Sequence, residues 1–299
     1  MITVSVPATS ANIGAGFDSC GLALALYNRV QMEEWDGVCI TSLDGTRVPA
    51  GPQNLVYRTA KGLYDECGAP LRGLRLAQEN GVPMARGLGS SSACIAAGLV
   101  GANELFGTSV HPHAAFERAA ALEGHPDNVA PAMLGGFVAS ALEGGRLYAV
   151  QKPVSQALCF AAFVPGYKLL TKKARARCPV GGAQGRCLQR LTRGAAGGGL
   201  LRREVRPSSR GHGRQAAPAV PRGADARHAR GVCAVRGAGC AWLVGKRRGA
   251  HAFAAVRAQN ETFFTAARAK LAAAERGSPL AAYTLHRLAP DNAGARATA

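Results

Sequence analysis

Apolar and polar positions follow two different patterns along most of the chain. Strand-like patterns predict strands at residues 2–6, 22–33, 38–43, 73–80, 147–153, 157–166, 252–256 and 281–289. Helix-like patterns predict helices at 54–68, 90–107, 111–124 and 261–277, and residues 125–140 are expected to pass from a short helix into a strand. The turn at Asp36-Gly37 predicts a hairpin of the second and third strands. Because strands and helices are mixed rather than alternating, the order favours an α+β fold over a doubly wound sheet.

Residues 173–250 carry neither pattern, and their composition differs from that of the rest of the chain. Only 12 of these 78 residues are Leu, Val, Ile, Met, Phe, Trp or Tyr, which is too few to fill a core. The block contains 18 basic and two acidic residues, whereas residues 1–172 contain 12 basic and 13 acidic ones. The net charge of +18 in this chain of 299 residues therefore belongs almost wholly to one block. A charge confined in this way is weaker evidence for nucleic-acid binding.

Several classes of protein are excluded by the sequence. No stretch approaches the roughly 18–20 apolar residues that a membrane helix needs, and residues 1–12 lack the basic and apolar regions of a signal peptide. The nine cysteines form no CxxC pair, which argues against zinc-ribbon and thioredoxin-like proteins. We therefore expect a cytoplasmic protein with reduced thiols and no membrane partner.

One loop has the residues that a phosphate-binding loop needs. In residues 83–93, PMARGLGSSSA, glycines let the backbone approach a ligand closely and three serines open a helix. The free N–H groups and the positive dipole end of that helix would face an anion. The loop is not a Walker A motif, because no Gly-Lys-Ser/Thr follows. A glycine-rich turn with a serine N-cap remains the structural alternative.

Two further segments are rich in polar residues. Residues 123–132, EGHPDNVAPA, place a carboxylate, an imidazole and a carboxamide directly before an apolar helix, and Glu117 precedes them. Asp127 or Asn128 could instead cap that helix, and His125 and Glu117 could be ordinary surface residues. Residues 7–18, PATSANIGAGFD, are expected to form a loop between strands. Three such segments on one scaffold favour a shared site.

In this order and spacing, PATSANIGAGFD, ARGLGSSSA and EGHPDNVAPA resemble the homoserine kinases of the GHMP kinase superfamily. The resemblance covers about residues 1–177. It implies a GHMP kinase fold, with an ATP-binding domain similar to domain 2 of ribosomal protein S5 at 1–155 and a ferredoxin-like domain at 156–299. Galactokinases and mevalonate kinases share the middle motif but differ in the first and third.

The resemblance also implies a nucleotide site for ATP and Mg²⁺. Ser91 and Glu117 match the magnesium ligands of the family, and both are hard oxygen donors. Asn54 stands where the family places an adenine contact. The remaining residues implied to bind the nucleotide form the phosphate loop: Pro83, Met84, Ala85, Arg86, Gly87, Leu88, Gly89, Ser90, Ser91, Ser92 and Ala93.

The same resemblance implies a site for L-homoserine. Asp18 is the natural partner for the substrate ammonium group, and Arg175 matches an arginine that binds the carboxylate with bidentate geometry. His125 is implied to contact the substrate as well, and whether a general base exists is left open. The residues implied to be catalytic are Asn12, Asn128 and Asp127.

Residues 178–245 depart from the family pattern, although 283–297 resemble its C-terminus again. The family has here an apolar helical region, a second substrate-binding arginine and a third glycine-rich motif resembling GSGPT. Either this segment is read out of frame or it is a basic insertion. Under the first explanation we expect 178–240 to be disordered or poorly packed, because too few side chains can be buried to stabilise a domain. This exact polypeptide would then have little or no kinase activity.

The function that the motifs favour is ATP-dependent phosphorylation of L-homoserine to O-phospho-L-homoserine, a step of threonine biosynthesis. One alternative is another GHMP small-molecule kinase. The other alternative is an RNA-binding protein in which a basic tail is attached to an S5-like domain. The basic block has a single aromatic residue, Trp242, and so lacks the stacking side chains of single-strand binders; we therefore expect no nucleic-acid partner. The sequence is compatible with a homodimer.

Overall fold

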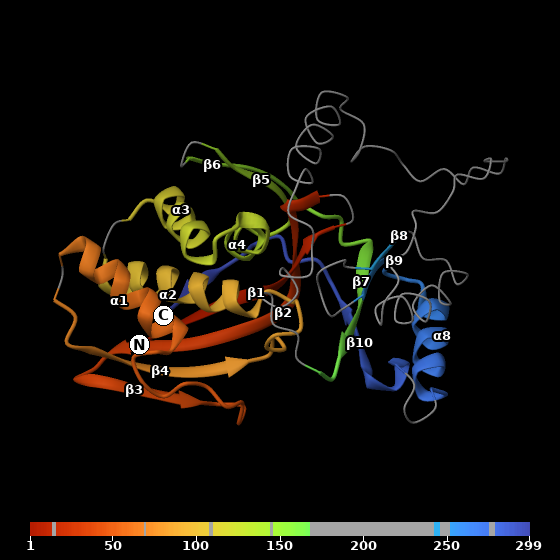
Figure 1. The fold of residues 1–299 in the computed structure, drawn as a ribbon, viewed down its shortest axis with the longest axis horizontal. Helices are drawn as coiled ribbons and strands as arrows, with labels where there is room; N and C mark the ends of the chain where they lie inside the picture. Colours follow the sequence, from red (N-terminus) through yellow and green to blue (C-terminus); the bar gives the residue numbers. More distant parts are fainter. Residues whose placement is uncertain are drawn as a thin grey trace.

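Two β-sheets stand side by side in the computed structural model, each with helices packed against it (Figure 1). The structure describes residues 1–13, 16–68, 70–107, 110–143, 146–167, 242–245, 252–274 and 279–299. Within these ranges the first sheet has seven strands, in the order β11-β1-β2-β4-β3, with β5 paired to β2 and β6 paired to β5. The strands of the first sheet are β1 (Ile2–Asn12), β2 (Gly16–Glu34), β3 (Gly37–Ser42), β4 (Gly73–Asn80), β5 (Phe137–Glu143), β6 (Arg146–Lys152) and β11 (Arg296–Thr298).

The first strand is longer than the sequence pattern predicts. The expected loop at residues 7–18 is extended backbone as far as Asn12, paired with β2 through Ser10 and Leu22. Its polar residues Thr9 and Ser10 are buried. The predicted loop is therefore wrong over most of its length, because polar side chains with buried partners can occupy a strand as apolar ones do.

The predicted hairpin of the second and third strands is also wrong. β3 pairs with β4 in parallel, and β4 lies between β3 and β2 (Figure 1). The backbone N–H of Trp35 donates to Gly73 O, at 3.2 Å, and the Gly37 N–H donates to Arg72 O, at 3.3 Å. A Cβ atom on Gly73 would lie 1.9 Å from Gly37 O, so only glycine permits this close approach.

Four helices cover one face of the first sheet (Figure 1). They are α1 (Leu55–Cys67), α2 (Ser90–Phe106), α3 (Pro112–Glu123) and α4 (Pro126–Leu134), which agree with the sequence prediction within a few residues. The glycines of α2 explain its small-residue sequence. A Cβ atom on Gly98 would lie 2.7 Å from Val56 O of α1, and one on Gly101 would lie 2.8 Å from Met32 Cε of β2. Because α2 is pressed between α1 and the sheet, its N-terminus is held firmly in place.

The second sheet contains four described strands in the order β10-β7-β9-β8. Phe163 packs with Phe263 and Phe264 of the covering helix in a separate core. The elements of this part are β7 (Leu158–Pro165), β8 (Trp242–Gly245), β9 (Ala252–Arg257), α8 (Glu261–Ala272), the short 3₁₀ helix η1 (Pro279–Ala282) and β10 (Tyr283–Leu288). The strands predicted at 157–166, 252–256 and 281–289 and the helix predicted at 261–277 are thus all present, and the fold is the α+β arrangement that the sequence favours.

The two sheets share a third apolar cluster. Leu22 and Leu24 of β2 pack there with Phe160 of β7 and Phe253 of β9, and Leu88 of the glycine-rich loop joins them. The phosphate-loop candidate is therefore anchored where the two sheets meet.

The predicted domain limits can be placed on this fold only in part. The chain passes from the first sheet to the second between Lys152 and Leu158, close to the predicted limit at 155. β11 belongs to the first sheet although it lies within the predicted second domain. The prediction for 178–245 falls outside the described residues, apart from Trp242–Gly245, which form β8 beside β9.

The C-terminal segment is fastened to the first sheet by Asp291. This buried carboxylate accepts a hydrogen bond from Tyr27 Oη at 2.8 Å and from the Gly294 N–H at 2.7 Å, and Arg296 lies 3.4 Å away. Burial, followed by the hydrogen bond to Asp291, raises the pKa of Tyr27. The phenol therefore remains a donor at neutral pH.

We expect Asp291→Ala to lower the free energy of unfolding by about 2–4 kcal/mol, because each buried donor that loses its acceptor costs roughly 1–3 kcal/mol. Asp291→Asn should lose less, since an amide oxygen can still accept from Gly294. The exposed Asp36 supplies the matched control. Urea unfolding followed by circular dichroism measures the difference, and equal midpoints for Asp291→Ala and Asp36→Ala would contradict the prediction.

Candidate active site

The glycine-rich loop joins β4 to α2 and exposes the N-terminus of that helix. Its backbone takes left-handed conformations at Ala85, Gly87 and Gly89, with φ of 55°, 85° and 73°. Gly89 is the N-cap of α2, and no side chain caps the helix. The Ser92 hydroxyl in its first turn is buried without a hydrogen-bond partner among the described residues. The first N–H groups of a long helix are thus open to an anion, which fits the phosphates of a nucleotide.

Three hydrogen bonds help to hold this loop in position. The Thr9 N–H of β1 donates to Leu88 O at 3.0 Å. Arg86 donates from Nε to Pro165 O at 2.9 Å and from a terminal nitrogen to Gly166 O at 3.1 Å, at the end of β7. The loop is therefore fixed to both sheets, which keeps its backbone preorganised for an anion.

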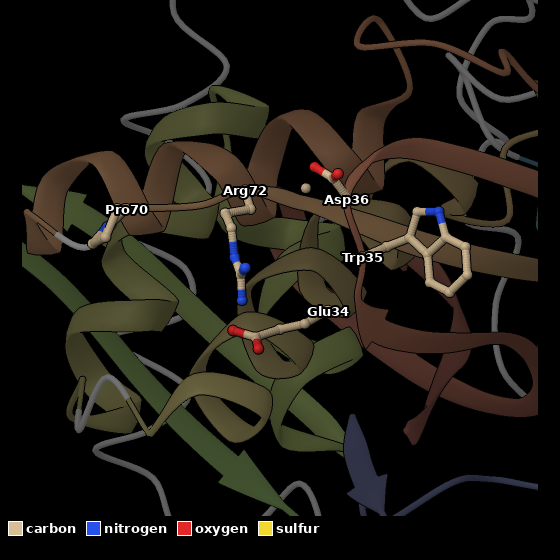
Figure 2. A pocket seen from close by; sticks show the side chains of 6 residues that line it. Glu34, Trp35, Asp36, Pro70 and Arg72 are labelled. Atoms are coloured by element: carbon tan, nitrogen blue, oxygen red, sulfur yellow. The ribbon is translucent and has the colours of Figure 1, made fainter.

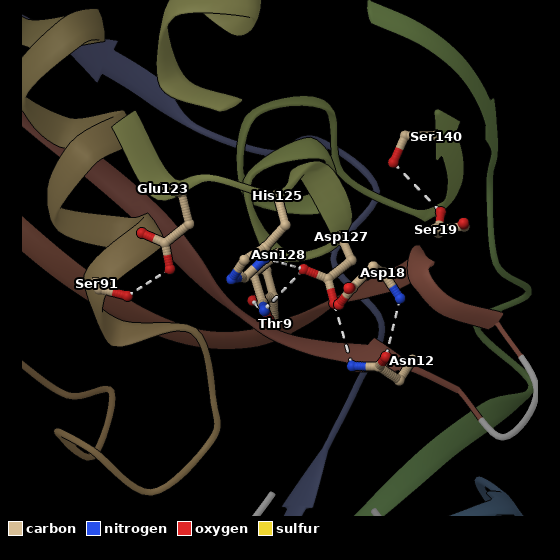
Figure 3. A network of polar contacts seen from close by, with 10 residues as sticks. All are labelled: Thr9, Asn12, Asp18, Ser19, Ser91, Glu123, His125, Asp127, Asn128 and Ser140. Atoms are coloured by element: carbon tan, nitrogen blue, oxygen red, sulfur yellow. Dashed lines mark hydrogen bonds and ion pairs between the residues drawn. The ribbon is translucent and has the colours of Figure 1, made fainter. Parts of the chain in front are cut away.

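Asp127 is the centre of a polar network at the start of α4 (Figure 3). Its side chain is 1% exposed. Oδ1 lies 2.5 Å from His125 Nδ1 and accepts from Asn128 Nδ2 at 3.3 Å, while Oδ2 accepts from Asn12 Nδ2 at 3.1 Å. Four of the residues predicted for the substrate site or for catalysis are thereby brought together, and both oxygens of Asp127 are engaged by neighbouring side chains.

Asp18 joins this network through the backbone. Its N–H donates to Asn12 Oδ1 at 3.0 Å. Both residues have positive φ, 69° at Asn12 and 52° at Asp18, which is uncommon for residues other than glycine. Such backbone strain is concentrated at functional sites, where the surrounding structure maintains it. The turn between β1 and β2 therefore holds Asp18 beside the residues of the Asp127 network (Figure 3).

The two predicted magnesium ligands, Ser91 and Glu117, each contact other residues. Ser91 Oγ donates to Glu123 Oε1 at 2.7 Å, not to Glu117 (Figure 3). Glu117 lies nearer the N-terminus of α3 than Glu123 does. Its Oε1 accepts from the Leu147 N–H at 3.3 Å and is 3.7 Å from His113 Nδ1. Glu123, the last residue of α3, is thus the carboxylate that contacts the N-terminus of α2 and a further candidate for the metal site. The assignment of Ser91 and Glu117 as magnesium ligands stays a prediction.

The side chain of Asn54 makes hydrogen bonds to other residues of the protein. It is the N-cap of α1, where its Oδ1 accepts from the N–H groups of Val56 and Tyr57, at 3.0 and 3.4 Å. Its Nδ2 donates to Pro49 O and to Gln78 Oε1, at 2.9 and 3.1 Å. Both amide hydrogens are therefore used, and an adenine contact by Asn54 stays a prediction.

Two residues of the site were missed by the sequence analysis. Thr9 and Glu123 both lie inside the quoted motifs, so the signal was present, but the motif letters do not say which side chains meet. Arg175, predicted to bind the substrate carboxylate, lies outside the described residues.

A pocket lies near the end of β2 that is far from the site (Figure 2). It has a volume of about 390 Å³ and is lined by Glu34, Trp35, Asp36, Pro70, Arg72 and Gly73. Glu34 ends β2, whereas the first residue of that strand, Gly16, pairs with Asn12 of the site. This pocket is therefore separate from the polar network. Among the described residues no three His, Cys, Asp or Glu side chains gather as a metal site would require, and no described helix has the length and apolar character to cross a membrane.

Part of the chain is similar in sequence to known proteins. Residues 54–136 match the family model described as the GHMP kinases N-terminal domain. A curated homoserine kinase of Caldicellulosiruptor bescii is 46% identical over 177 residues, which is 58% of each chain. The chain thus spans somewhat less than three fifths of the length of that relative.

Solved structures resemble the chain over a larger share of its length. The homoserine kinase of Cytophaga hutchinsonii superposes with a TM-score of 0.72 and 24% identity, covering 99% of this chain and 97% of that one. A mevalonate kinase of Methanococcus jannaschii gives a TM-score of 0.65 at 10% identity, covering 97% and 98%. The fold is that of the GHMP kinases.

Proposed function

We propose that this protein is an ATP:L-homoserine phosphotransferase that makes O-phospho-L-homoserine for threonine biosynthesis in the cytoplasm. The observation that supports it most is the meeting of two features: the uncapped N-terminus of α2 and the polar network around Asp127. One feature suits a phosphate donor and the other a small polar acceptor. The sequence identity between this chain and curated homoserine kinases favours homoserine as that acceptor.

For the donor, residues 83–93 would hold the phosphates of ATP through backbone N–H groups. Ser91 and Glu123 would hold Mg²⁺, because they offer two hard oxygen atoms beside the open helix end. When bound, the metal would neutralise negative charge that develops during phosphoryl transfer. Protein magnesium sites commonly use one or two side chains together with phosphate oxygens, and this pair matches that number.

For the acceptor, Asp18 would pair with the ammonium group of homoserine, and Arg175 would bind its carboxylate. Asn12 and Asn128 would orient the attacking hydroxyl. Both carboxamides contact Asp127, so their positions are fixed before substrate binds. In a loose transition state, such positioning supplies most of what the protein contributes.

Asp127 itself is better suited to positioning than to general base catalysis. Its Oδ1 is occupied by His125 and Asn128 and its Oδ2 by Asn12. A base must reach the hydroxyl proton of the substrate, and a carboxylate that is 1% exposed and already holds three side chains is poorly placed to do so.

The experiment that tests the function is a transfer assay on the purified full-length chain with Mg·ATP and L-homoserine, mevalonate or galactose. The assay measures ADP release and identifies the phosphorylated product by mass spectrometry. A preference for homoserine supports the proposal, whereas a preference for mevalonate or galactose would assign the chain to another GHMP kinase. Because we expect little turnover if 178–245 is read out of frame, a chain with this segment translated in the alternative frame is assayed in parallel. Size-exclusion chromatography of both chains tests the homodimer.

Asp18→Asn is expected to weaken homoserine binding much more than nucleotide binding. Removing one partner of a desolvated charged pair costs roughly 2–5 kcal/mol, whereas the loop that faces the phosphates does not include Asp18. Isothermal titration with L-homoserine and with the non-hydrolysable analogue Mg·AMP-PNP measures both affinities. Equal losses for the two ligands would instead indicate a folding defect and would contradict the assigned role.

A further inference from the structure

Thr9 connects all three motifs of the site. It belongs to the first motif, on β1, and is fully buried. Its N–H donates to Leu88 O of the phosphate loop at 3.0 Å, and its hydroxyl donates to Asn128 Oδ1 of the third motif at 2.9 Å (Figure 3).

Thr9 is also packed tightly against Gly89. A Cβ atom built on Gly89, the N-cap of α2, would lie 1.9 Å from Thr9 Oγ1 and 3.4 Å from Asn128 Oδ1. The Thr9 hydroxyl therefore sits directly against the backbone that opens the anion site. The hydroxyl is therefore in contact with both the helix N-cap and the carboxamide of Asn128.

The carboxamide of Asn128 has two fixed contacts. Its Oδ1 accepts from Thr9, and its Nδ2 donates to Asp127 Oδ1 at 3.3 Å. A carboxylate oxygen can only accept, so the amide nitrogen must face it and the amide oxygen must face Thr9. The shorter of the two contacts is the one from Thr9.

We propose that Thr9 is a positioning residue, which holds the Asn128 carboxamide at a set place relative to the phosphate loop and thereby aligns the acceptor with the donor. This inference rests on the proposed function for its reaction, but its geometric part concerns Thr9 and Asn128 alone. Thr9 acts through Asn128 and is not itself expected to touch either substrate.

The test compares Thr9→Val, which keeps the shape but removes the hydroxyl, with Thr9→Ser, which keeps the hydroxyl. For Thr9→Val we expect kcat with homoserine to fall about 10- to 100-fold, as for a small misplacement of a reacting group, with an unchanged Kd for Mg·AMP-PNP. Thr9→Ser should restore most of the rate. In an Asn128→Ala background, Thr9→Val should have no further effect, because the residue through which it acts is already lost.

A second readout needs no substrate. The side-chain NH₂ signals of Asn128 in the ¹H–¹⁵N spectrum, assigned by their loss in Asn128→Ala, should shift in Thr9→Val and return in Thr9→Ser. Unchanged signals in Thr9→Val would overturn the inference, as would equal weakening of homoserine and nucleotide binding by Thr9→Val. If wild-type protein binds no homoserine, the proposed function fails, yet the spectra still decide the role of Thr9. Should Thr9→Val not fold, Thr9→Cys takes its place.

Discussion

Glu123→Gln is expected to reduce phosphoryl transfer by about 100-fold or more and to raise the Mg²⁺ concentration needed for half the maximal rate. Glu123 Oε1 lies 2.7 Å from Ser91 Oγ at the N-terminus of α2. Glutamine keeps the shape of the side chain and one oxygen but removes the negative charge that attracts the cation. Loss of charge stabilisation by a metal is worth several kcal/mol, and each 1.36 kcal/mol is a factor of ten in rate.

Glu117→Gln, at the metal ligand expected from the sequence, provides the comparison on the same helix. Glu117 accepts from the Leu147 N–H and lies near His113, away from α2, so its variant should keep a rate and a Mg²⁺ dependence close to those of the unmodified chain. Magnesium titrations of transfer, and of Mg·AMP-PNP binding by calorimetry, measure both variants. If Glu117→Gln lost the metal dependence and Glu123→Gln retained it, the original assignment from the sequence would be restored.

Asp127→Asn should lower kcat by about 100-fold or more, with a smaller change in nucleotide affinity. The carboxylate fixes His125 and Asn128 through one oxygen and Asn12 through the other. An asparagine has only one acceptor oxygen, so at least one of these side chains loses its partner and moves. A misplacement of about 1 Å at a reacting centre costs on the order of 100-fold in rate.

The control for this substitution is Asp65→Asn on the outer side of α1. Asp65 is exposed and pairs with Lys61 at 2.7 Å, and such surface pairs contribute about 0–1 kcal/mol. Its variant should match the unmodified chain in rate and in thermal midpoint. An Asp127→Asn protein that turned over at the normal rate would show that the network is structural and that the acceptor binds elsewhere.

The sequence predicted the helices well because their patterns are local. The small-residue run of α2, the cap at Asn54 and the glycines that end α1 and α3 each act within a few residues. The pairing of strands is not local. β3 pairs with β4, which follows it after a whole helix, and nothing in residues 36–37 distinguishes that outcome from a hairpin.

The sequence predicted several residues that meet in the site but not which side chains contact one another. The three motifs do meet, and Asn12, Asp127, Asn128 and His125 form one network. Glu117 and Glu123 could not be distinguished by residue type, since both are carboxylates on α3. Six residues along a helix correspond to a rotation of about 240°, so the two side chains point in clearly different directions, and only the packed structure decides which meets Ser91.

The position of β11 has a consequence for synthesis of the protein. Residues 296–298 pair with Thr3, Val4 and Ser5 of β1, so this pairing cannot form until residues 296–298 have been synthesised. Until then that margin of β1 has unpaired N–H and C=O groups, which attract strands of other chains. Nascent molecules that stall before residue 296 are consequently the species most exposed to aggregation, and chaperone binding during translation would be most valuable in that interval.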